Sequence, residues 1–324
     1  MKTLKLKPTD ANIRKAARIL QKGGLVALPT ETVYGLAANA MNTKAVRRIF
    51  KAKGRPSDNP LIVHIADRRM LSTLVDTIPE HARLLMRHFW PGPLTLVLRH
   101  NGTLPLTVTA GLSTVAVRLP GLALTRKIIR LSGVPLAAPS ANRSGRPSPT
   151  QSEHVLHDLD GRIEAVIEGG IARVGIESTV VDVTGKIPVI LRPGHITIED
   201  IRRVCDHARL SHHRRHTSVR SPGMKYRHYA PDTPLQIITP EKIEAYAKRN
   251  THLRLGIMTM RRGLHIPNAT VIYIGNTPTR AARHVFAALR KLDGKVDRIV
   301  CEALEEKGIG HAVMNRLKKA ASKK

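Results

Sequence analysis

The residues that point most directly to chemistry are two cations, Lys53 and Arg55, separated by one glycine. They lie in the segment KAKGRPSDNPLIVHI (51–65), where Gly and Pro stiffen the loop and Asn59 follows. Such a pair can hold a polyphosphate or a carboxylate through charge-assisted hydrogen bonds. The sequence has no G-x-x-x-x-G-K-[ST] loop, so a nucleotide would have to be held in another way. The alternative is a solvated turn between a helix and a strand.

Two further polar residues end apolar stretches. Arg118 follows Val115–Val117, and His64 follows Leu61–Val63. A buried charge is costly unless it is paired, and no acid is close to Arg118 in the sequence. Arg118 is therefore a candidate clamp for a substrate carboxylate. For His64, a satisfied core histidine and a functional histidine both remain open.

Four corners rich in small and hydroxyl-bearing residues interrupt the apolar segments. Their short side chains let backbone amides and hydroxyls approach a ligand closely. For the hydroxyls of the first corner, spacing alone favours helix capping over substrate binding. No corner decides a function by itself. The four are PTETVYGL (29–36), AAPSANRSGRPSPT (137–150), EST (177–179) and LRPG (191–194).

The charge of the chain is its compositional outlier. The 324 residues include 54 Lys+Arg and 24 Asp+Glu, a formal net charge of +30, which favours anionic partners such as RNA, nucleotides or lipid. The alternative is a bias toward Lys and Arg on solvated faces. Cys205 and Cys301 show no metal-type spacing and fit a reducing compartment. With no apolar leader and no run near the ~20 residues of a membrane span, we expect a cytoplasmic protein without membrane contact.

Alternating helical and extended segments must position these residues. The spacing of apolar residues in the first two thirds predicts an α/β or α+β layered domain that ends near Cys205, after a helix capped by Thr197. Helices are expected over 10–21, 43–51, 81–90 and 122–131, and strands over 25–28, 61–65, 94–98, 115–118, 136–138, 166–168, 179–183 and 189–191.

A basic linker and a second unit follow. The run HHRRH (212–216) lacks a carboxylate or cysteine ligand, so a flexible basic linker is favoured over a metal site. From residue 233, alternating strands and helices predict a small Rossmann-like three-layer domain, without the G-x-G-x-x-G that would assign it a dinucleotide. Its strands are expected over 235–238, 255–258, 271–274 and 298–301, and its helices over 241–248, 279–292 and from 311.

Taken together, these segments resemble the YrdC-like family in its long, two-domain form. The resemblance spans nearly the whole chain in the family's order, and its last two pieces mark the two-domain form. It implies a YrdC-like twisted open mixed sheet with helices over 1–205, a linker or lid over 206–232 and the smaller domain over 233–324. The matching pieces are PTETVYGL, KAKGRPSDNPLIVHI, WPGPLTLVL, VAVRLP, APSANRSGRPSPT, IESTVVD, ILRPG, SPGMKYRHYAP and KGIGHAVMNR.

The resemblance implies an activity. Family members combine L-threonine, bicarbonate and ATP into threonylcarbamoyl-AMP and pyrophosphate, which makes them nucleotidyltransferases of the EC 2.7.7 class. The product serves N6-threonylcarbamoylation of adenosine 37 in tRNA. The expected cofactor is Mg²⁺ with ATP, with no metal held by the protein itself. The expected partners are the downstream threonylcarbamoyl transferase machinery and, by direct contact, tRNA.

The resemblance also implies roles for individual residues. Arg118 would hold the carboxylate of threonine, and Lys53 and Arg55 would be catalytic because cations stabilise the charge on departing pyrophosphate. Tyr226 would fold over the nucleotide as a lid. The threonine pocket would consist of Thr32, His64, Arg118, Ala138 and Ser178, and the ATP site of Arg55, Asn59, Thr114, Ser140, Ser148, Arg192 and Tyr226.

Two other functions compete with this one. A module that binds double-stranded RNA or tRNA without adenylyl transfer would agree with the charge of +30. Such a clamp does not need Thr32, His64 and Ser178 beside the cations, which is the feature that separates the two. A carbamoyl-phosphate-dependent maturation factor is disfavoured because the sequence lacks zinc-finger cysteines and an acylphosphatase segment.

Overall fold

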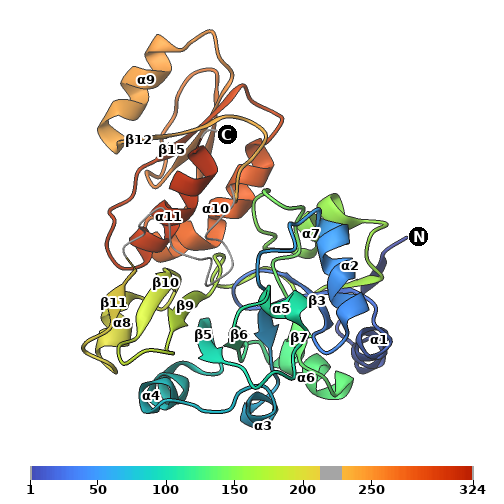
Figure 1. The fold of residues 1–324 in the computed structure, drawn as a ribbon. Helices are drawn as coiled ribbons and strands as arrows, with labels where there is room; N and C mark the ends of the chain where they lie inside the picture. The colour runs from blue at the N-terminus through green and yellow to red at the C-terminus, as the bar shows by residue number, and fades with distance from the viewer. Residues whose placement is uncertain (1, 212–227, 323–324) are drawn as a thin grey trace.

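The structure is a computed structural model that describes residues 2–211 and 228–322. It consists of a large α/β domain with a smaller domain seated on one side (Figure 1). Among the described residues, no helix combines the length and the apolar character that crossing a membrane requires.

The large domain is built on a mixed sheet, as predicted. Its described strands follow the order β1-β8-β2-β3-β7-β4-β6-β5-β9-β10-β11, with parallel pairs such as β4·β6 beside antiparallel pairs such as β5·β6. The strands are β1 (Leu4–Leu6), β2 (Val26–Leu28), β3 (Gly35–Asn39), β4 (Ile62–His64), β5 (Leu94–Arg99), β6 (Thr114–Arg118), β7 (Leu136–Ala137), β8 (Ala165–Ile167), β9 (Thr179–Asp182), β10 (Val189–Arg192) and β11 (Arg209–Leu210).

Helices cover this sheet, and local signals set their ends. The hydroxyl of Thr9 caps the first helix, and Thr197 caps the last one as expected, in a capping box with Asp200. Gly54 ends the second helix in the left-handed conformation at φ 61°, which turns the chain into the cationic loop. The helices are α1 (Asp10–Gln21), α2 (Thr43–Lys53), α3 (Arg68–Ser72), α4 (Glu80–Phe89), α5 (Leu106–Thr109), α6 (Ala123–Ser132), α7 (Ser152–Leu159) and α8 (Ile198–Arg202).

The smaller domain has the predicted three layers. Its parallel sheet follows the order β12-β15-β13-β14, with α9 packed on one face and α10 and α11 on the other. Figure 1 shows α10 and α11 on the side that faces the large domain. The elements are β12 (Leu235–Ile238), the 3-10 turn Pro240–Lys242, α9 (Ile243–Arg249), β13 (Leu255–Thr259), β14 (Ala269–Tyr273), α10 (Pro278–Leu292), β15 (Arg298–Glu302) and α11 (Ile309–Ala321).

The two domains share a hydrophobic core. Val33 and Ile176 of the large domain pack in the same buried cluster as Tyr229 and Phe286. The rings of Tyr229 and Phe286 stack with centroids 5.4 Å apart. The sheet of the large domain continues through β11 to Leu210, five residues past the boundary expected at 205. The division into domains by residue number stays a prediction.

Candidate active site

One cavity gathers most of the predicted site residues. It lies where β4, β6 and β7 end: His64 and Arg118 are register partners on the parallel strands β4 and β6, and the Ala138 N–H donates to the carbonyl of Ile62 at 2.9 Å. Arg55 and Arg192, expected in the ATP site, and Arg118, expected in the threonine pocket, all line it. The predicted residues on the cavity wall are Thr32, Arg55, His64, Arg118, Ala138, Ser140, Ser178 and Arg192.

Arg118 is buried and held by three contacts. Its guanidinium lies 2.5 Å from the Glu31 carboxylate and donates to the Thr32 hydroxyl at 2.8 Å and to the Gly92 carbonyl at 3.2 Å. The acid partner that the sequence did not reveal is thus Glu31. Burial would raise the pKa of this carboxyl, but the charge of Arg118 and hydrogen bonds bring the pKa below its usual value. Glu31 therefore stays ionised and fixes the arginine at the cavity wall.

Arg192 and Ser178 form another part of the wall. Arg192 donates to the Ser178 carbonyl through Nε at 3.1 Å and through Nη2 at 3.0 Å, and Nη2 also lies 3.1 Å from the Ser178 hydroxyl oxygen. The Ser178 hydroxyl is 2.7 Å from the hydroxyl of Thr95. These contacts orient a buried cation and a hydroxyl beside one another, an arrangement suited to a small anionic ligand.

His64 is buried on the same wall. Burial, together with the nearby charge of Arg118, lowers the pKa of His64 to about 3, so the ring is neutral at pH 7. Its Nδ1 has no hydrogen-bond partner among the described residues. The ring can therefore exchange a hydrogen bond with a ligand, which favours the functional interpretation over a satisfied core histidine.

The buried state of His64 leads to a prediction about acid stability. Between pH 6.5 and about 3 the unfolded chain binds a proton at His64 that the folded protein does not, so stability falls as the pH falls. We expect His64→Gln to reduce the loss of unfolding free energy between pH 7 and pH 5 by about 2 kcal/mol. Urea titrations at both pH values measure this, with the exposed His252→Gln as control. An identical pH dependence in wild type and His64→Gln would contradict it.

The cationic loop is divided between the cavity and the interior. Arg55 lines the cavity and donates to the carbonyls of Asn59 and Pro60 at 3.4 and 3.3 Å. Lys53 does not line it: its buried ammonium donates to the carbonyl of Ser140 at 2.6 Å and to that of Asn142. Burial, and next the charge of Arg55, hold the pKa of Lys53 well below its usual range. The placement of Lys53 does not support direct contact with a reacting phosphate.

Three more predicted ATP residues lie off the cavity wall. Asn59 is 1% exposed, and neither amide atom of its side chain has a partner among the described residues. Ser148 is buried and its hydroxyl donates to Glu177. Thr114 begins β6, four residues from Arg118 at the other end, a separation of about 13 Å along the strand. Tyr226 lies outside the described residues.

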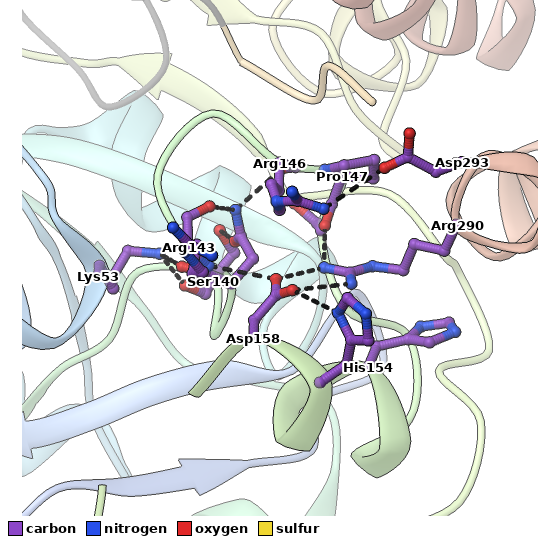
Figure 2. A network of polar contacts seen from close by, with 12 residues as sticks. Lys53, Ser140, Arg143, Arg146, Pro147, His154, Asp158, Arg290 and Asp293 are labelled. Carbon is purple, nitrogen blue, oxygen red and sulfur yellow. Dashed lines mark hydrogen bonds and ion pairs between the residues drawn. The ribbon is translucent and has the colours of Figure 1, made fainter. Parts of the chain in front are cut away.

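A network of polar contacts holds the loop 139–150 that brings Ser140 to the cavity (Figure 2). Lys53 binds it from α2, and Asp158 of α7 accepts from the Arg143 N–H at 3.2 Å. Arg290 of α10 completes the network from the other domain, 2.7 Å from Asp158 and in contact with the Pro147 carbonyl. The loop is thus fixed by both domains.

Some residues of the cavity were missed from the sequence. Glu177, His228 and Tyr229 line it beside the predicted residues. His228 and Tyr229 belong to the motif in which Tyr226 was chosen, and Glu177 immediately precedes Ser178. The signal available in the sequence was that these residues lie in the motifs SPGMKYRHYAP and IESTVVD, which match the family. Nothing in the sequence distinguished them from their neighbours.

Comparison with known proteins identifies the family of this chain. Residues 18–194 match the Sua5/YciO/YrdC family model, which is described as "Telomere recombination". The chain belongs to the Sua5/YciO/YrdC family. Residues 196–322 match the model described as "Threonylcarbamoyl-AMP synthase, C-terminal domain", so this family member has the two-domain form.

Relatives of this family member match over nearly their whole length. A threonylcarbamoyl-AMP synthase of Bacillus subtilis is 48% identical over 98% of this chain and 95% of its own. One of Pyrococcus abyssi is 47% identical over 95% of this chain and 94% of its own. The crystal structure of P. abyssi Sua5 complexed with L-threonine superimposes with a TM-score of 0.93, at 45% identity, covering 99% of this chain and 98% of that one.

Proposed function

We propose that this protein is a threonylcarbamoyl-AMP synthase. It would act as a nucleotidyltransferase of the EC 2.7.7 class that converts L-threonine, bicarbonate and ATP into threonylcarbamoyl-AMP and pyrophosphate, for modification of tRNA. One observation carries the proposal: Arg55, Arg118 and Arg192 share a single cavity with the polar set Thr32, His64 and Ser178. The names of the relatives and the threonine bound in the P. abyssi structure support it.

The threonine subsite would be the part of the cavity around Arg118. Arg118 would bind the substrate carboxylate, because a guanidinium whose other contacts are fixed presents donors in a rigid fork. The Thr32 and Ser178 hydroxyls and the neutral His64 ring would hydrogen-bond the remaining polar groups of threonine. Ala138 would supply a small apolar surface beside the methyl group.

The reaction would proceed by two bond-forming steps. The amino group of threonine first adds to bicarbonate, giving the carbamate and releasing water. A carbamate oxygen then attacks the α-phosphorus of ATP while the bond to the pyrophosphate oxygen breaks. Arg55 and Arg192 would stabilise the charge that accumulates on phosphate oxygens. Exclusion of water from the cavity would limit hydrolysis of threonylcarbamoyl-AMP, which is a mixed anhydride.

Other parts of the ATP site would act from the cavity rim or from behind its wall. Ser140 would contact the nucleotide, and Lys53 would act through the Ser140 backbone that it holds. Asn59, with its unpartnered buried amide, Thr114, Ser148 and Tyr226 stay predicted contacts. Mg²⁺ would enter with ATP as part of the substrate. A threonylcarbamoyl transferase would take up the product, and direct tRNA contact stays a prediction.

The test is a product assay with purified protein. ATP, Mg²⁺, bicarbonate and labelled threonine are expected to give pyrophosphate and a labelled adenylate only when all components are present. Serine in place of threonine tests whether the pocket reads the methyl group. Pyrophosphate release that does not depend on threonine, or its absence altogether, would contradict the proposal. If no pyrophosphate is released at all, the alternative of an RNA-binding module without adenylyl transfer remains.

A further inference from the structure

The C-terminal domain buries an arginine against the cavity of the large domain. Arg316 on α11 is 1% exposed and is the largest fully buried side chain among the described residues. An arginine at such a depth is costly unless a partner compensates its charge. Its partners therefore indicate what it does.

Those partners belong to the cavity wall. Arg316 Nε lies 3.1 Å from Glu177 Oε2, and its Nη1 donates to the Pro193 carbonyl. The guanidinium carbon lies 5.8 Å from the ring centroid of Tyr229, within cation–π range. Glu177 and Tyr229 both line the cavity. A helix of the smaller domain thus supplies a cation immediately behind the wall.

The charge of Glu177 explains why a cation is needed there. An ionised carboxylate in the wall would repel the triphosphate and the substrate carboxylate that the arginines attract. Within 4.0 Å and among the described residues, the only cation paired with Glu177 is Arg316. Burial would raise the pKa of Glu177, but the charges of Arg316 and then Arg192 lower it, so this acid stays ionised.

A second cation lies on the same face of α11. Lys319 follows Arg316 by three residues, the spacing that places two side chains on one helix face. Burial, and next the charges of Arg316 and Arg192, lower its pKa to about 8. Arg316 and Lys319 therefore both place positive charge near Glu177 and Arg192.

We propose that Arg316 is a positioning residue of the ATP site, through which the C-terminal domain neutralises Glu177 so that the cavity accepts a triphosphate. The inference rests on the proposed function. It gives the C-terminal domain a direct part in nucleotide binding, since without α11 the Glu177 carboxylate would lose its ion-pair partner.

The experiment compares Arg316→Met, Glu177→Gln and the double variant. Arg316→Met is expected to raise KM for ATP at least tenfold, with a smaller effect on KM for threonine, because the Glu177 carboxylate, left without its ion-pair partner, would repel the phosphates. Glu177→Gln is expected to bind ATP as tightly as wild type or more tightly. The double variant is expected to return KM for ATP to within threefold of wild type, which loss of packing alone would not allow.

Controls separate folding from charge. Lys318→Met alters the exposed side of the same helix and is expected to behave as wild type. Arg316→Lys keeps the charge and serves if Arg316→Met does not fold, with KM for ATP expected within threefold of wild type. A tenfold rise in Arg316→Lys, an unchanged KM in Arg316→Met, weaker ATP binding by Glu177→Gln, or no recovery in the double variant would overturn the inference.

Titration of each variant with a fluorescent ATP analogue distinguishes this inference from the proposed function. It measures nucleotide binding without turnover. The nucleotide affinities of the Arg316 and Glu177 variants can therefore be compared even if wild type forms no product. A wild type that releases pyrophosphate while all variants bind the analogue equally refutes the inference alone. A wild type that binds the analogue and forms no product refutes the proposed function alone.

Discussion

Arg118→Gln is expected to lower kcat/KM for threonine by at least about 100-fold, which corresponds to about 2.7 kcal/mol. The side chain is 3% exposed and aligned by Glu31 and Thr32, so the substrate carboxylate would meet a cation that needs no reorganisation. Truncating one partner of a buried charge pair typically costs 2–5 kcal/mol, partly because the other charge is left unpaired. Threonine-dependent release of pyrophosphate at varied threonine measures the effect.

The second charge of the pair provides the control for this prediction. Glu31→Gln combined with Arg118→Gln removes the stranded carboxylate, so the double variant is expected to regain thermal stability without regaining threonine turnover. Arg130→Gln on the exposed side of α6 is expected to leave both unchanged. If Arg118→Gln kept the threonine kinetics of wild type, Arg118 would be a structural residue and the threonine subsite would lie elsewhere.

The sequence predicted elements well where a strong period or cap marks them. Helix α1 has the predicted bounds, since its buried residues Ile13, Ala16, Ala17 and Leu20 follow helical spacing and Thr9 caps it. Strand β3 was not predicted, because its sequence GLAAN lacks β-branched and aromatic residues. It forms because β2 and β7 offer it antiparallel partners, which local sequence does not show.

The candidate site was predictable as a set of motifs, whereas its electrostatics were not. Arg118 was correctly expected to lie inside, but Glu31, its partner, is 87 residues away. Arg316 lies on the buried side of α11, and its partner Glu177 is 139 residues away across the domain interface. The spacing of Lys53 and Arg55 suggested two equivalent cations. In the structure Arg55 lines the cavity, whereas the buried ammonium of Lys53 binds backbone carbonyls away from the cavity wall.

The interdomain pair of Asp158 and Arg290 is expected to matter most for stability. Their side chains are 1% and 9% exposed and lie 2.7 Å apart (Figure 2). Asp158→Ala leaves Arg290 buried without its acid and frees the Arg143 N–H, for which we expect a loss of about 3–5 kcal/mol. Urea unfolding followed by the fluorescence of Trp90 measures it.

A matched exposed pair tests whether burial is the cause. Asp10 and Lys127 lie 2.6 Å apart with side chains 66% and 49% exposed, so Asp10→Ala is expected to cost far less unfolding free energy than Asp158→Ala. Replacing both Asp158 and Arg290 by leucine removes the unpaired charge and is expected to recover most of the stability. Loop 139–150 would lose its contact with Asp158 both in Asp158→Ala and in the double leucine variant, so proteolysis near Ser140 is expected to accelerate in each. Equal costs for Asp158→Ala and Asp10→Ala would show that the buried pair stabilises the protein no more than an exposed one, which would contradict the prediction.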